Sequence, residues 1–355
     1  MKLSCILLLI SCMLSINSGA QQMDTAECKT TCTCGMGTFT PLGIMTDHVH
    51  PKGEWMVSYT YMNMMMNGNI IGDKKTSDNT VYQKYSMAPE SMSMQMHMLM
   101  LMYGLNDRLT MMLMQGFTMG NMSMNMDPNM PNMPGMTPGD TRMSTLSSGF
   151  TDTKIFGLYM LADKENYRVV ASMGINIPTG TIRATGTTML GNNQRLPYNM
   201  QVGNGNWGIM PDVTYMHQCN KIAWGTDAGA DIKLANNSLG YRQGNVYHIT
   251  IWGSYKFLSY VSGSLRAENV IWDRISGSDP AIDIPIYVKS DPTANTANYG
   301  GNVTNIYAGL NFHFPYKVFE KMNLLLEYGM PVYQNLNGTQ MANLCNLQIG
   351  LQYKL

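Results

Sequence analysis

The feature that most constrains this chain is a series of segments of about ten residues, each alternating between two kinds of side chain, that runs from residue 54 to the last residue. The gaps between these segments are alternately short and long, which is typical of antiparallel strands that cross a membrane. We expect about twelve strands, with short turns on the periplasmic side and long loops on the extracellular side. Their predicted ranges are 54–66, 92–103, 108–119, 151–161, 167–177, 206–217, 221–234, 246–257, 260–272, 303–314, 322–330 and 341–355.

Alternation alone does not distinguish a lipid-facing strand from one that packs on a dry core, so a soluble β-sandwich or solenoid is an alternative. Charged residues make up only 13% of the chain, about half of the usual share, which favours lipid contact. No stretch after residue 20 approaches the roughly 18 apolar residues of a membrane-spanning helix. The sequence therefore predicts an all-β, transmembrane antiparallel β-barrel.

The formal net charge of the chain is zero, which indicates no electrostatic attraction to nucleic acid.

The first 53 residues precede the predicted barrel. Residues 1–20 have a basic start, an apolar middle and a small-residue end, which predicts a signal peptide; lipidation at Cys12 is the alternative. Residues 21–53 form a periplasmic segment rich in Cys and His, and whether residues 21–50 plug the barrel is left open. This segment contains two groups of candidate metal ligands. The first is Cys28, Cys32 and Cys34, for which a local disulfide is the alternative. The second is His48 and His50, for which loop histidines without a ligand are the alternative.

Turning the polar rows inward places charges of both signs inside the barrel. These charges indicate a hydrated, narrow or partly plugged pore; structural salt bridges without a solute are the alternative. The candidate lumen residues are Arg168, Asp212, Asp227, Asp231, Lys256, Arg266 and Glu268.

Methionine is the strongest anomaly of the sequence, because 37 residues are Met and many lie between residues 56 and 143. With the aromatic and leucine rows facing lipid, four methionines of the first and third strands point inward: Met62, Met64, Met112 and Met114. In the second strand the polar residues slightly favour an outward Met row (92–102), which would put His97 on the inner wall. Thioether and imidazole together favour copper(I). The alternative is that Met serves as an adaptable apolar filler.

The segment 119–143 contains further methionines among Gly, Asn and Pro. Its Asp-Pro, Met-Pro and Pro-Gly pairs predict an exterior Met-rich loop without regular structure. The candidate donors there are Met122, Met124 and Met126. Such a loop would capture soft ions or scavenge oxidants.

Several segments resemble a known family. The segment 43–56, followed by Ser58-Tyr59, and the segments 92–108, 176–180 and 195–198 are similar to outer-membrane proteins catalogued as phenol-degradation meta-pathway proteins and often called transporters. The resemblance implies an outer-membrane barrel of a Gram-negative bacterium that passes small molecules, and its Met-rich members imply an association with copper. It implies no catalytic residues, and nothing in the sequence selects phenol.

The sequence thus favours a porin-like transporter or channel for small solutes that handles copper(I). A surface protein that sequesters metal or buffers oxidants without transport is the alternative. A hydrolase is a third class, but no nucleophile elbow is found, so we expect no enzyme. The expected partners are outer-membrane lipid, the barrel assembly machinery and a small solute or metal ion; copper(I) is the one cofactor candidate.

Overall fold

The computed structural model describes residues 40–129, 141–314 and 321–355, all of which belong to one compact unit. The predicted signal peptide and the candidate ligands Cys28, Cys32 and Cys34 lie outside the described residues. In the described part of the chain, no helix is both long and apolar enough to cross a bilayer.

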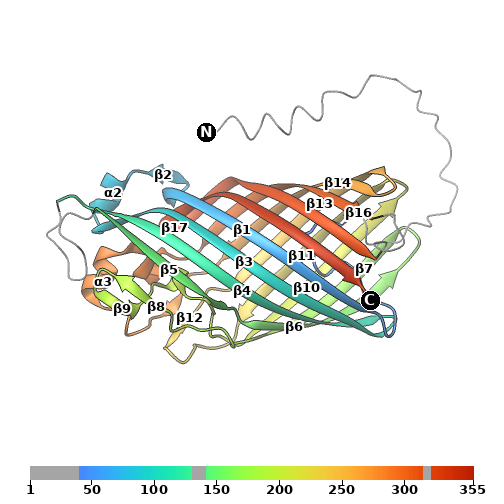
Figure 1. The fold of residues 1–355 in the computed structure, drawn as a ribbon, viewed down its shortest axis with the longest axis horizontal. Helices are drawn as coiled ribbons and strands as arrows, with labels where there is room; N and C mark the ends of the chain where they lie inside the picture. The colour runs from blue at the N-terminus through green and yellow to red at the C-terminus, as the bar shows by residue number, and fades with distance from the viewer. Residues whose placement is uncertain (1–39, 130–140, 315–320) are drawn as a thin grey trace, which may run out of the picture. The chain divides into compact units, whose positions relative to one another are not determined.

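Antiparallel strands form a sheet that closes on itself (Figure 1). Each strand pairs with its neighbour in the ring, and the last strand pairs with the first. The eleven ring elements of the described residues are β1 (Trp55–Gly72), β3 (Met87–Asn106), β4 (Leu109–Met126), β6 (Thr153–Asp163), β7 (Tyr167–Ile177), β10 (Gly208–Cys219), β11 (Ile222–Lys233), β13 (Val246–Leu258), β14 (Val261–Trp272), β16 (Gly301–His313) and β17 (Met322–Lys354).

The last element, β17, is a hairpin rather than one straight strand. Its first part pairs with β16, and its second part pairs with β1. Leu336, at the reversal, is paired with Gly301 of β16 and with Gly72 of β1. The Lys354 N–H donates to the Lys321 carbonyl at 3.0 Å, so the two ends of β17 lie side by side. Gly338, at φ 61°, allows the chain to reverse. The eleven elements therefore cross the barrel twelve times, as the alternation predicted.

Short turns join the strands at one end of the barrel, and longer connections with small elements gather at the other (Figure 1). β5 (Arg142–Phe150) pairs with the second half of β4, beyond the part that pairs with β6. The remaining elements are β2 (Lys74–Thr76), α2 (Asp78–Tyr82), β8 (Thr185–Thr188), β9 (Gly191–Arg195), η1 (Tyr198–Met200), β12 (Tyr241–Arg242), β15 (Ser276–Gly277), α3 (Pro285–Ser290), η2 (Pro292–Ala294) and η3 (Thr296–Asn298).

The outer surface of the ring is apolar and the inner surface is mixed. Ile251 is 62% exposed and Leu265 is 65% exposed on neighbouring strands, whereas the alternate residues Thr250 and Arg266 are buried inside. This distribution is the inverse of a water-soluble protein, in which exposed faces are polar. A closed ring has no free strand edge, so its backbone satisfies the demands of a lipid environment.

The outward Met row that the polar residues slightly favoured for the second strand is wrong. Its Met row faces inward: Met102 pairs with Met112 and Met98 with Gly116, and Met98, Met100 and Met102 are buried. The cause is an irregularity between Gly104 and Asn106, where one extra residue shifts the register of β3 on β4. A one-residue shift exchanges the two faces of a strand.

The predicted boundaries of the Met-rich loop are also wrong. β4 continues as a strand to Met126, and β5 begins at Arg142, so Met124 pairs with Met143 across two strands. The Pro residues that favoured a loop come only after Met126. Residues 130–140 lie outside the described residues.

The hairpin reversal of β17 gives a test of the fold. A Cβ at Gly338 would lie 2.1 Å from Asn298 Oδ1, whereas a Cβ at Gly68 (φ 72°) would meet no atom within 4 Å. Both alanine variants introduce backbone strain, because each position has a left-handed backbone. Only Gly338→Ala also brings its side chain into a steric clash with Asn298. We expect Gly338→Ala to lower the free energy of unfolding by about 1–3 kcal/mol more than Gly68→Ala, measured by urea unfolding in detergent. Equal losses would contradict the assigned reversal.

Candidate functional site in the lumen

Residues 40–50, here called the plug segment, lie inside the short-turn end of the barrel. Leu42, Ile44 and Thr46 are buried. The Asn311 side chain donates to the Thr40 carbonyl at 2.9 Å, and the His50 N–H donates to Thr110 Oγ1 at 2.8 Å. Of the segment whose role was left open, residues 40–50 therefore occupy the lumen.

The plug segment meets a cluster of two carboxylates and one imidazole, Asp212, Asp227 and His248, here called the carboxylate cluster. His248 Nε2 lies 3.2 Å from Asp212 Oδ2 and 3.0 Å from Asp227 Oδ2. Thr46 Oγ1 lies 2.7 Å from Asp212 Oδ1 and 3.4 Å from Asp227 Oδ1. Thr214 donates to Asp227 Oδ1 at 2.8 Å and also contacts the Thr46 hydroxyl.

A glycine explains how the carboxylate cluster forms. Asp212 and His248 lie on β10 and β13, which are separated by β11, and Gly229 of β11 stands opposite both. A Cβ at Gly229 would lie 2.4 Å from Asp212 Oδ2 and 2.7 Å from the His248 ring. The missing side chain therefore allows the imidazole to reach across a strand.

A second charge group lies on the next strands. Arg266 Nη2 lies 2.9 Å from Glu327 Oε2, and Arg266 Nη1 lies 3.2 Å from Glu268 Oε1. The guanidinium also stacks on Tyr307, 3.8 Å from the ring centre. The side chains of Arg266 and Glu327 are 2% and 0% exposed, and such burial is tolerable only because the charges are paired. Gly43 of the plug segment packs against the guanidinium, where a Cβ would clash.

The seven predicted lumen residues all lie on inward rows, but they form separate groups. Arg168 pairs with Asp163 at 3.3 Å, Asp231 pairs with Lys233 at 2.5 Å, and Lys256 lies near the short-turn end of β13. Sequence reasoning did not single out His248, Glu327 or Lys233, although His248 belongs to the polar row of its strand. The plug contact of Thr46 left no signal in the sequence, because it joins residues 166 positions apart.

Methionine side chains cover the inward faces of β1, β3 and β4, and we call this surface the Met wall. The register places Met62 opposite Met96 and Met64 opposite Met94. It also places Met114 opposite Met100. At the long-loop end Met122 and Met124 are fully buried. This surface includes the four methionines that were predicted to face inward, Met62, Met64, Met112 and Met114. The candidate loop donors Met122, Met124 and Met126 lie on the same face of β4.

His97 is not part of the Met wall, contrary to the sequence-based expectation. Since the Met row faces inward, the alternate residue His97 faces outward, beside Tyr61. Its Nδ1 lies 2.7 Å from the Tyr59 hydroxyl. The other candidate histidines lie at the plug: His48 Nδ1 is 2.6 Å from Asp47 Oδ1, and the rings of His48 and His50 meet edge to face at 4.9 Å.

The long connections fold over the opposite end of the barrel. One buried cluster joins these connections to Met122 and other methionines of the Met wall. The connections contribute Met189, Leu196, Tyr198 and Tyr241. Apolar burial therefore closes the long-loop end, whereas the plug segment at the short-turn end is held by polar contacts as well as by burial of Leu42 and Ile44.

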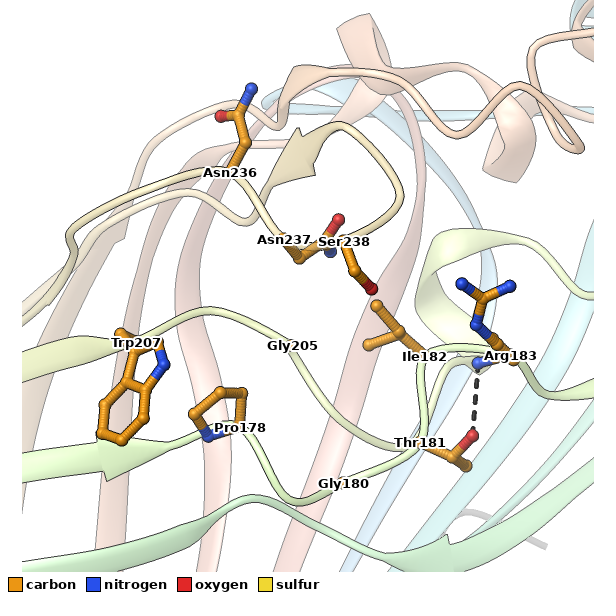
Figure 2. A pocket seen from close by; sticks show the side chains of 10 residues that line it. All are labelled: Pro178, Gly180, Thr181, Ile182, Arg183, Gly205, Trp207, Asn236, Asn237 and Ser238. Carbon is orange, nitrogen blue, oxygen red and sulfur yellow. Dashed lines mark hydrogen bonds between the residues drawn. The ribbon is translucent and has the colours of Figure 1, made fainter.

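Two of the cavities lie beneath or among the long connections. The smaller, about 180 Å³, lies inside the barrel between Met96, Met98 and Met114 on one side and Lys154 and Asn176 on the other. The larger, about 490 Å³, lies among the long connections (Figure 2). Its lining combines Trp207 and Pro178 with the amides of Asn236 and Asn237, and the Arg183 N–H donates to Thr181 Oγ1 at 3.2 Å (Figure 2). Both cavities are large enough for water molecules.

The closed ring and its apolar exterior define a transmembrane β-barrel of the outer-membrane class. The COG4313 outer membrane channel from Pseudomonas putida F1 is similar in fold, with a TM-score of 0.56 at 15% identity over 86% of this chain and 97% of that chain. The NanC porin (TM-score 0.42, 10% identity, 83% of this chain and 100% of that chain) and the KdgM porin (0.39, 9%, 83% and 98%) are more distant. The chain therefore has the fold of an outer-membrane β-barrel.

Residues 110–279 match the family model described as "Putative MetA-pathway of phenol degradation". The match reaches from β4 to β15 and supports the resemblance, and the opening segment 43–56 lies outside it. A search among curated proteins found no match.

Thr46 allows the docking of the plug segment to be tested. Thr46→Val removes the hydroxyl from Asp212 and Asp227 with little change in side-chain volume, and a hydrogen bond to a charged group contributes about 1.5–3 kcal/mol. We expect the undocked fraction to rise about tenfold or more, measured as faster amide exchange of residues 40–50 in the refolded barrel. Thr46→Ser keeps the hydroxyl, so its residues 40–50 should exchange as those of the parent do. Unchanged amide exchange of residues 40–50 in Thr46→Val would contradict this docking.

His50 makes the docking depend on pH. Burial, aided by the positive potential of His48, lowers the pKa of His50 to about 4, although Glu54 opposes the shift. An undocked His50 titrates near 6.5, so the undocked state binds more protons between these values. The contribution to docking is thus complete above pH 6.5 and is lost as the pH falls toward 4. Amide exchange of residues 40–50 should become faster over this range, and His50→Gln should remove that part of the dependence.

Proposed function

We propose that this protein is an outer-membrane channel for small solutes whose Met wall binds and passes copper(I). One observation carries the proposal: thioether side chains of β1, β3 and β4 face the lumen continuously from Met56 near the short turns to Met124 beneath the long connections.

The channel part rests on the fold and the lumen. The barrel is closed, its interior contains charges of both signs, and a cavity lies inside it beside Met96, Met98 and Met114. Charges that only stabilised a solid core would be costly relative to apolar packing. A hydrated path that opens when an end closure moves accounts for them.

The copper part rests on the chemistry of the Met wall. Neighbouring strands hold paired side chains about 5 Å apart, so a soft ion can pass between thioethers of adjacent strands. Every second residue of 56–64, 92–102 and 110–126, beginning with the first of each range, faces inward. None of these inward residues has an ionisable side chain. Hard cations would therefore find no strong ligands on this surface, whereas copper(I) would. A purely protective surface role is disfavoured for Met122, Met124 and Met143, because all three are buried.

The decisive experiment separates thioether ligation from apolar filling. The refolded chain is titrated with copper(I) against a competing chelator, with Cys28, Cys32 and Cys34 changed to Ser so that these thiols do not compete. The test variant is Met96→Leu, Met98→Leu and Met114→Leu, which line the inner cavity. The control variant is Met65→Leu, Met111→Leu and Met119→Leu, which are exposed on the outer face. Leu has nearly the same volume, so both sets should fold.

We expect the inner set to weaken copper(I) binding at least about tenfold, because it removes three ligands, and the outer set to leave binding unchanged. In proteoliposomes, the inner set should also lower the rate of copper(I) flux, and the outer set should leave that rate unchanged. Equal affinity in the two sets would show that Met fills space, and would overturn the copper part of the proposal. Flux of an uncharged or anionic solute would still test the channel part alone.

A further inference from the structure

We propose that the carboxylate cluster is a binding site for a borderline divalent cation of the zinc class. The site lies on β10, β11 and β13, apart from the Met wall, and uses nitrogen and oxygen donors instead of thioethers. It is therefore independent of the copper proposal.

The spacing of the three ligand atoms fits such an ion. Asp212, Asp227 and His248 each offer one ligand atom, and these atoms all lie within 4.8 Å of one another. The two distances from His248 Nε2 to the carboxylates, 3.2 Å and 3.0 Å, are close to the roughly 3.3 Å between ligands of a tetrahedral zinc site. Three protein ligands with an open fourth position are a common arrangement for zinc.

A second observation points to a ligand at the same place. Ser172 stands directly opposite Asp212 on β7, on the same inward row, and is 6% exposed. Its hydroxyl has no hydrogen-bond partner among the described residues. A buried hydroxyl without a partner is costly, and a hydrated cation held by Asp212 would give it one. Gly229 adds to this, because its missing side chain leaves the space in which His248 and Asp212 converge.

The charge of the cluster also favours a cation. No lysine or arginine in the described part of the chain forms an ion pair with Asp212 or Asp227, so only the imidazole is close enough to offset two carboxylates. By contrast, Glu327 and Glu268 share Arg266 nearby, and Asp231 has Lys233. A divalent ion would neutralise both carboxylates and leave His248 as a neutral ligand. Thr46 places its hydroxyl at the cluster from the plug segment, so the bound ion would lie between wall and plug.

The test is a Zn²⁺ titration of the refolded full chain against a chromophoric chelator, with Cys28, Cys32 and Cys34 again changed to Ser. The principal variant is His248→Gln, because it keeps both carboxylates that hold Thr46. Two controls address three of the other imidazoles: His313→Gln, whose ring contacts Asn323, and the double variant His48→Gln with His50→Gln. Heat-modifiable gel mobility verifies that each variant is a folded barrel.

We expect the parent and His313→Gln to bind Zn²⁺ with the same affinity, and the His48 and His50 variant to bind more tightly than His248→Gln. His248→Gln should weaken binding at least about tenfold, because loss of a residue that only orients a metal ligand already has an effect of this size. Co²⁺ should give tetrahedral absorption bands in the parent that disappear in His248→Gln. The proposal is overturned if His248→Gln binds as the parent does, if the parent binds only at millimolar Zn²⁺, or if binding disappears in the His48 and His50 variant.

Discussion

Backbone hydrogen bonding between β17 and β1 is the constraint on which the rest of this structure depends. In lipid an unpaired strand edge would leave a row of N–H and C=O groups without partners, so the sheet is stable only as a closed ring. Closure requires the last strand to return beside the first, which the register from Met56↔Lys354 to Gly72↔Leu336 achieves. Once the ring is closed, each residue faces either lipid or lumen. The apolar exterior, the charged interior and the Met wall all follow from that division.

Much of this division could be predicted from the sequence, because strand alternation is a local property. The number of barrel crossings, the positions of the strands and the inward rows of charges agree with the structure. Where the prediction was wrong, a nonlocal or fine-scale feature decided the outcome. One extra residue near Leu105 reversed the face of the Met row and moved His97 outside. Pairing with β3 and β5 extended β4 through Met126, despite local residues that favour a loop. The contacts of Thr46 depend on tertiary structure alone.

The lumen has two chemically different sides. The Met wall is uncharged and polarizable, whereas β10 to β16 present carboxylates, imidazole and guanidinium groups. A solute inside would therefore meet soft donors on one side and hard or borderline donors on the other. Copper(I) and zinc-class ions prefer different sides by ligand type alone, since thioethers select the first and carboxylate with imidazole suits the second. If both proposed sites bind their ions, this separation would allow one barrel to distinguish them without a change in its fold.

The two ends of the lumen are closed by different physical interactions, and this difference gives them different sensitivities. The long-loop end is closed by buried methionine, tyrosine and aliphatic side chains, so opening it exposes apolar surface to water. The plug segment is held by apolar burial of Leu42 and Ile44 and also by polar contacts, among them the hydrogen bonds of Thr46 to Asp212 and Asp227. The polar contacts respond to protonation and to bound cations, whereas apolar burial does not. Because the carboxylate cluster touches the plug segment directly, an ion bound there would change the free energy of plug docking, and docking would change ion affinity by the same factor. If the carboxylate cluster binds an ion as proposed, the short-turn end is the one whose closure would respond to that ion.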